Sequence, residues 1–116
     1  MLDAAPHSLT TRISYTCPSG KKAMVELLYA AVIRKTAPTT VGRAVTAWYL
    51  TPSGGTEGLI MEAILFSSTV GDRIYLSPSG NLMLFPGDTL TSKTFDGSTG
   101  GTCDYQMGYK ITEFDA

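Results

Sequence analysis

The sequence predicts an all-β fold: an antiparallel two-sheet sandwich, jelly-roll-like, with about eight strands. Three observations predict it. Apolar and polar residues alternate over several short segments, as in half-buried antiparallel strands. Pro-Ser-Gly occurs at 18–20, 52–54 and 78–80, and each tripeptide favours a tight turn because Pro fixes φ and Gly accepts positive φ. The best helix candidate, residues 21–35, has apolar residues on both faces and is rich in Val, Ile and Tyr, which favour strands.

Each expected strand has its own signal. Residues 9–16 alternate weakly, and 21–35 fits one long bent strand or a buried strand pair. Two further segments are 43–51, which alternates, and 59–66, which is apolar on both faces. The clearest period of two runs from Cys103 to Thr112, with Cys, Tyr, Met, Tyr and Ile on one face. Short apolar segments bounded by turn residues complete the set at 73–77, 82–85 and 89–95.

A chain of 116 residues is one domain's worth of protein. We expect a single sandwich domain over 9–116, preceded by a flexible arm at 1–8, with loops at 36–42 and 96–102. An immunoglobulin-like arrangement is the structural alternative, although the one tryptophan lacks flanking cysteines at the expected spacing.

Charge and composition exclude several functions. The net charge of −1 provides no field that would recruit nucleic acid or an anionic membrane. The longest apolar runs, 23–33 and 59–66, are too short to span about 30 Å of hydrocarbon. The first residues lack the pattern of a secretory signal, so synthesis and assembly in the cytoplasm of a host are expected.

Catalytic and metal sites are also disfavoured. His7 is the only histidine, which excludes a Ser-His-Asp triad or a histidine metal cage within one chain. Cys17 and Cys103 are expected to be reduced, buried thiols, with a disulfide as the alternative. The segment 97–102 is a hairpin loop and not a phosphate-binding loop, because no Gly-Lys-Ser/Thr is present. We therefore expect no enzyme activity, no cofactor and no metal.

Two acids and two aromatic residues have more than one possible role. Glu62 stands in an apolar strand and could be a proton donor with a raised pKa, but a solvent or interface position opposite Arg73 or Arg43 is favoured. Glu26 is expected to pair with a basic residue across strands. Trp48 and Tyr49 lie on opposite faces, so one of them is expected to be exposed or at an interface.

The apolar surplus indicates assembly. A two-sheet sandwich buries one face of each strand, so strands that are apolar on both faces leave hydrophobic surface for a partner. This predicts an obligate oligomer. The expected interface residues, in the oligomer or against a larger particle, are Leu2, Leu9, Trp48, Ile60, Glu62, Ile64 and Phe66.

Three short motifs point to a particular family. The first runs from Cys17 to Tyr29 (CPSGKKAMVELLY), the second from Leu82 to Leu90 (LMLFPGDTL), and a terminal strand ends at Ile111-Thr-Glu113. Together they resemble a family of small all-β bacteriophage virion proteins, spread in the expected order over most of 17–113. The chain departs from the pattern at Cys17, where an aliphatic residue is usual, and in its extended loops at 36–42 and 96–102.

The resemblance implies a jelly-roll-like domain that decorates or joins particle components, commonly as a trimer, with no catalytic residues to carry over. We therefore expect a capsid cement or decoration protein, located in the virion, that binds the major capsid protein or other virion proteins and stabilises the head. A tail, adaptor or baseplate component of the same fold is the first alternative. A carbohydrate-binding module that uses Trp48 and nearby tyrosines is the second, and a small hydrolase or cupin-like enzyme is the third.

Overall fold

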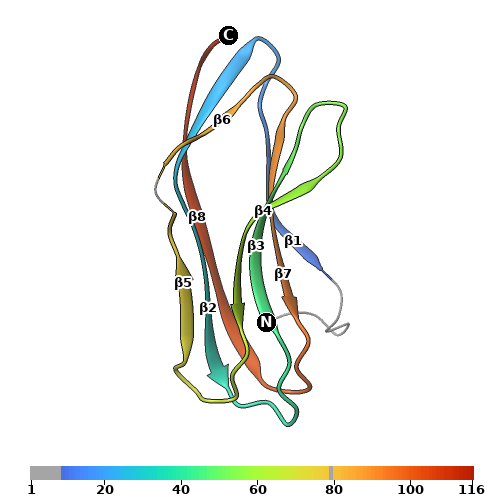
Figure 1. The fold of residues 1–116 in the computed structure, drawn as a ribbon, viewed down its shortest axis with the longest axis vertical. Helices are drawn as coiled ribbons and strands as arrows, with labels where there is room; N and C mark the ends of the chain where they lie inside the picture. The colour runs from blue at the N-terminus through green and yellow to red at the C-terminus, as the bar shows by residue number, and fades with distance from the viewer. Residues whose placement is uncertain (1–8, 79) are drawn as a thin grey trace.

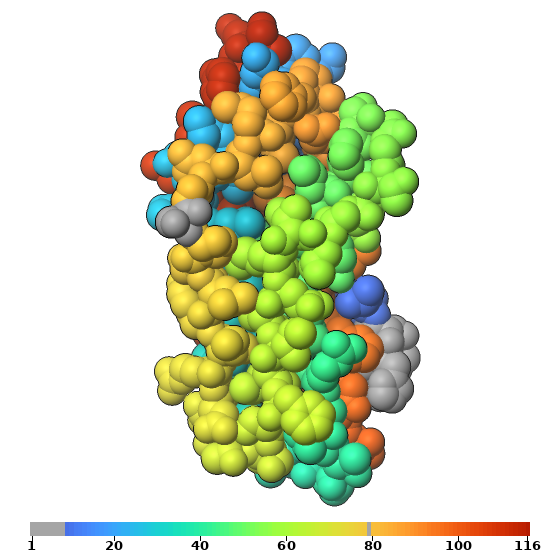
Figure 2. Space-filling model, viewed as in Figure 1, coloured from blue at the N-terminus to red at the C-terminus, as the bar shows by residue number. Residues whose placement is uncertain are grey.

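The computed structural model describes residues 9–78 and 80–116, which form eight strands and, within these ranges, no helix (Figure 1). The molecule is elongated, with principal extents of 50 × 26 × 16 Å (Figure 2). No helix among these residues is long and apolar enough to cross a membrane. The strands are β1 (Thr10–Thr16), β2 (Lys21–Thr36), β3 (Ala44–Thr51), β4 (Gly58–Leu65), β5 (Arg73–Leu76), β6 (Leu82–Leu84), β7 (Thr89–Asp96) and β8 (Thr102–Asp115).

The strands form two antiparallel sheets, which confirms the predicted sandwich. Sheet A has the order β1-β7-β3-β4. In sheet B the long strand β2 pairs with β8 along one edge and with β5 and then β6 along the other. The chain passes from one sheet to the other at most of its connections, as in a jelly roll.

The strand bounds follow the predicted segments closely, and residues 21–35 form one strand instead of a pair. β2 spans 16 residues and carries a bulge at which Leu27 and Leu28 together oppose Tyr109 of β8. Leu27 adopts a φ of +54° and is 70% exposed. A bulge adds one residue to one strand, so the inward and outward positions exchange beyond it.

This exchange explains part of the apolar pattern of β2. Before the bulge, Ala23 and Val25 face the core; after it, the inward residues have even numbers, as Ala30 and Val32 do. Beyond the bulge, however, the outward positions are occupied by Tyr29, Ala31 and Ile33, and Ala31 is only 2% exposed. This part of β2 is therefore apolar on both faces.

The core fills the space between the two sheets. Its larger part contains Trp48 with Val25 and Leu84, and a smaller part towards the lower end of Figure 1 contains Val32, Leu65 and Cys103. Trp48 packs edge-on against Tyr109, with ring centroids 5.5 Å apart. The outer faces of the sheets and their edges remain as candidate interaction surfaces.

Candidate functional site

Glu62 and Ile64, two of the predicted interface residues of β4, lie on its outer face. Val45 and Ala47 of β3 are the partners of Ile64 and Glu62, and all four point away from sheet B. Ile64 is 37% exposed, and Phe66, just after the strand, is 63% exposed. The structure thus places a row of apolar side chains on the surface, at the edge of sheet A, and Glu62 lies among them.

The inner face of β4 explains why these residues point outward. Met61, Ala63 and Leu65 are paired with inward residues of β3 and fill the core. Ile60 is an extra residue in β4, between the pairs Tyr49–Leu59 and Trp48–Met61. Because of this bulge, Ile60 and Leu59 are both exposed. Ile60 is therefore on the surface.

A shallow hollow of about 270 Å³ lies on the outer face of sheet A. Arg43 and Glu62 bring opposite charges to it, but they are not within ion-pair distance of each other. Directly opposite Glu62 is Ala47, and Arg73 lies in the other sheet. The rest of the lining is Leu9, Val45, Tyr49 and Phe95. The lining is therefore mixed, with two charged side chains among apolar and aromatic ones.

Lys93 contacts Tyr49, one of the residues that line this hollow. Its Nζ lies 2.8 Å from the Glu57 carboxylate and 5.0 Å from the centroid of the Tyr49 ring. Burial, followed by the negative charge of Glu62, raises the pKa of the Tyr49 hydroxyl. Tyr49 is therefore neutral near pH 7 and serves as a rigid wall of the hollow.

The prediction for Trp48 as an interface residue was wrong. Trp48 is fully buried, and its Nε1 donates a hydrogen bond of 2.8 Å to the main-chain oxygen of Tyr29. Of the pair Trp48–Tyr49, it is Tyr49 that lies on the outer face. The carbohydrate-binding alternative thereby loses the residue on which it mainly depended.

Leu9 and Leu2 have different outcomes. Leu9 is exposed and lines the same hollow as Phe95, beside the start of β1. Leu2, His7 and the rest of the expected arm at 1–8 lie outside the described residues. Glu26 stands directly opposite Lys110, the basic cross-strand neighbour that the sequence predicted, although the two charges do not form an ion pair.

A second hollow, which is mainly apolar, lies along the other side of β4, between the two sheets. Figure 2 shows β4 and β5 side by side on this face. A volume of about 200 Å³ is lined by Leu28, Ile60 and Leu82, among others, and a neighbouring one of about 270 Å³ by Tyr75 and Leu76. Met61 and Pro78 line both. β4 therefore has exposed apolar surface on both of its flanks.

A buried polar cluster at the lower end of Figure 1 was not predicted. Arg34 is fully buried; its Nε donates to the Ser67 main-chain oxygen at 2.9 Å and its Nη2 to Ser98 Oγ at 3.1 Å. Ser98 Oγ in turn bonds Gly42 N and O. Arg34 thus joins the three loops that follow β2, β4 and β7. The sequence feature that could have indicated this cluster is an arginine within the apolar segment that forms β2.

The surroundings of Arg34 hold further buried polar groups. Asp96 accepts a 2.8 Å hydrogen bond from Ser98 N, and burial, with the Asp96 charge second, raises the pKa of the Tyr105 hydroxyl. Nη1 of Arg34 and the Tyr105 hydroxyl lack hydrogen-bond partners in the described part of the chain. With Arg34 completely enclosed, the cluster orders loops and offers no access to a substrate.

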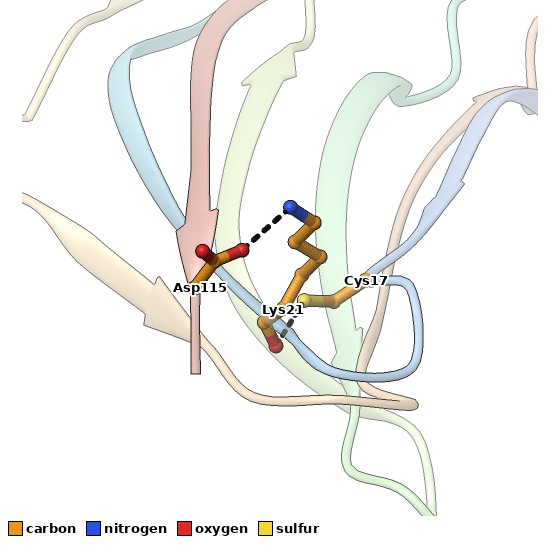
Figure 3. Close-up of polar contacts among 3 residues, drawn as sticks. All are labelled: Cys17, Lys21 and Asp115. Atoms are coloured by element: carbon orange, nitrogen blue, oxygen red, sulfur yellow. Dashed lines mark hydrogen bonds and ion pairs between the residues drawn. The ribbon is translucent and has the colours of Figure 1, made fainter.

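The two cysteines lie in different clusters and are buried thiols. Figure 3 shows the Cys17 thiol pointing to the Lys21 main-chain oxygen, at 3.3 Å, while Lys21 Nζ contacts Asp115 at 2.8 Å. Burial raises the pKa of both thiols, which keeps them protonated and weakly nucleophilic. Over residues 9–78 and 80–116, no three His, Cys, Asp or Glu side chains gather as a metal site would require.

Comparison of the chain with models of known protein families finds no match, and comparison with curated proteins finds no significant relative.

Proposed function

We propose that this protein is a non-enzymatic structural subunit that assembles with copies of itself, with a trimer as the expected state. The observation that carries the proposal is the group of exposed large apolar residues in β4 and directly after it: Leu59, Ile60, Ile64 and Phe66. Large apolar residues that cluster at one edge of a sheet mark an interaction surface or an aggregation hazard.

The energetics favour a permanent contact. Complete burial of a fully exposed Phe or Ile side chain contributes about 1.5–3 kcal/mol; Phe66, 63% exposed, would gain the larger share of this and Ile64, 37% exposed, the smaller. The same contact repeats in every copy of a symmetric assembly. The low share of charged residues, 16%, leaves few long charged side chains that would keep this edge in solvent.

The particle to which the oligomer belongs is proposed from the motifs. The stretch from Leu82 to Leu90 resembles a turn of small phage virion proteins, and in this fold Asp88 closes that turn through hydrogen bonds of 2.9 Å from Phe85 N and Ser53 N. We therefore propose a cement or decoration protein that binds the major capsid protein of a bacteriophage head and adds buried interface to the shell. A tail, adaptor or baseplate position is the alternative.

Light scattering on the purified protein tests the oligomer. The expected result is a trimer, and a monomer at micromolar concentration would overturn the proposal. As a matched pair of variants, Phe66→Ser and Val70→Ser each remove one exposed apolar side chain, but only the first follows β4 directly. Dissociation is expected for Phe66→Ser alone.

Undecorated phage heads test the proposed location. Adding the protein is expected to raise the melting temperature of the heads, and Phe66→Ser to reduce the effect. Heads that neither bind the protein nor gain stability exclude the cement role. Labelled protein seen at the tail in images of intact particles would establish the alternative instead.

A further inference from the structure

The two edge strands of sheet A have a directional relationship that bears on assembly. Each neighbouring pair in the order β1-β7-β3-β4 is antiparallel, so β1 and β4 run in opposite directions. A second copy placed beside the first in the same orientation brings its β1 next to β4 as an antiparallel neighbour. Pairing of two different edges of this kind closes into a ring when the rotation between copies permits.

The two edge strands of sheet A are also better matched in length than the short edge strands of sheet B. β1 has 7 residues and β4 has 8, whereas β5 has 4 and β6 has 3. The free edge of β8 carries the charged residues Asp104, Lys110 and Glu113, which discourage pairing. In the described part of the chain, β4 pairs only with β3.

The rows of side chains across sheet A set the register. One row on the outer face contains Phe95, Val45 and Ile64, and Leu9 meets Phe95 at the same hollow. The next row contains Thr11, Lys93, Ala47 and Glu62. If a second copy continues the sheet at the same level, its Leu9 comes beside Ile64.

Charge favours the same arrangement. In that register Glu62 faces the uncharged Thr11 of the next copy on the outer face, whereas the bulged residue Arg12 turns to the inner face, where its Nε donates to Thr94 Oγ1. Glu62 is half-buried and forms no ion pair within its own chain over the described ranges. A two-fold pairing of β4 with β4 centred on Glu62 would instead oppose two like charges, which is destabilising.

We propose that the oligomer forms by antiparallel pairing of β4 of one copy with β1 of the next, which continues sheet A around a closed ring. Ile64 packs on Leu9 of the next copy, and Glu62 faces its Thr11. This inference rests on the proposed self-assembly and adds to it the two strands that meet. The proposed pairing depends on none of residues 1–8.

Cysteine trapping tests the pairing. Directly opposed residues of antiparallel strands have Cα atoms about 4.5–5.5 Å apart, within the range of a disulfide. The single variants Leu9→Cys and Ile64→Cys, mixed and oxidised, are expected to give a covalent dimer, and the double variant a covalent ring. Val70→Cys is the control, since it is exposed but lies on the β4–β5 connection. Mixed with Leu9→Cys it is expected to give no cross-link.

The outcomes separate this inference from the proposed function. An oligomer by light scattering without Leu9–Ile64 cross-links, or with Ile64→Cys cross-linked to itself, overturns the strand pairing and leaves the structural role intact. A monomeric wild-type protein overturns the proposed function and the pairing with it.

Charge placement provides an independent measurement. Thr11→Glu brings a second carboxylate opposite Glu62 of the neighbouring copy and is expected to raise several-fold the concentration at which the oligomer dissociates. Thr11→Lys places an opposite charge at the same position and is expected to lower that concentration. Equal effects of the two variants contradict the pairing.

Discussion

The indole nitrogen of Trp48 donates a 2.8 Å hydrogen bond to the main-chain oxygen of Tyr29 and so joins the two sheets through the core. Trp48 belongs to β3 in sheet A, and Tyr29 to β2 in sheet B. The bond lies beside the bulge of β2, along a stretch of the strand that neither β5 nor β6 covers. The Tyr29 carbonyl is therefore satisfied by a side chain of the opposite sheet.

Replacing Trp48 with Phe is expected to reduce the free energy of unfolding by about 1–3 kcal/mol, because a buried carbonyl loses its donor. Urea denaturation followed by circular dichroism measures the change. Tyr49→Phe, on the outer face of the same strand, is the control, with an expected change within about 0.5 kcal/mol. Equal effects for the two variants would contradict the role of the Trp48 bond.

Replacing Leu27 with Asn is expected to stabilise the protein. Leu27 holds a φ of +54°, which costs about 1–2 kcal/mol for most L-residues and less for Asn. Its side chain is largely exposed, so little packing is lost. Leu27→Ala keeps the Cβ atom and is expected to give no gain. Thermal unfolding distinguishes the variants, and a lower melting temperature for Leu27→Asn would refute the prediction.

Replacing Arg34 with Gln is expected to destabilise the end of the sandwich at which three loops meet. A hydrogen bond from a charged donor contributes about 1.5–3 kcal/mol, and the variant removes the fork that reaches both Ser67 and Ser98. Faster hydrogen exchange is expected at Gly97 N and Thr99 N, whose acceptors lie in the β2–β3 connection. Lys35→Gln, exposed and next in sequence, is the control. Unchanged exchange in Arg34→Gln would show that the loops hold together without it.

Stability is expected to fall at alkaline pH. Burial raises the pKa of Cys17, Cys103 and Tyr105 in the folded state. The unfolded chain loses these protons first, near pH 8.5 for Cys and about 10 for Tyr, so deprotonation favours unfolding. The stabilisation is complete below those values and is lost as the pH rises through them. Urea denaturation between pH 7 and 10 measures the slope, which Tyr105→Phe is expected to reduce above pH 9. A flat profile would contradict this.

The sequence by itself determined the all-β class and the approximate bounds of every strand, because alternation and turn residues are local signals. It also placed Ile64 and Phe66 on the surface, since both faces of β4 are apolar and a sandwich buries one. It could not assign the buried side of β3, and Trp48 was placed wrongly.

Only the tertiary structure decided which residues of β2 and β4 point inward and where Arg34 lies. The bulge at Leu27 adds a residue opposite β8, which is far away in sequence, and the bulge at Ile60 adds one opposite β3, the preceding strand. In both strands the added residue exchanges inward and outward positions along the rest of the strand. Arg34 depends on Ser67 and Ser98, which come close only when three loops meet at one end. The local sequence pattern shows how apolar and polar residues alternate along a strand, but the pairing with other strands determines which side is buried.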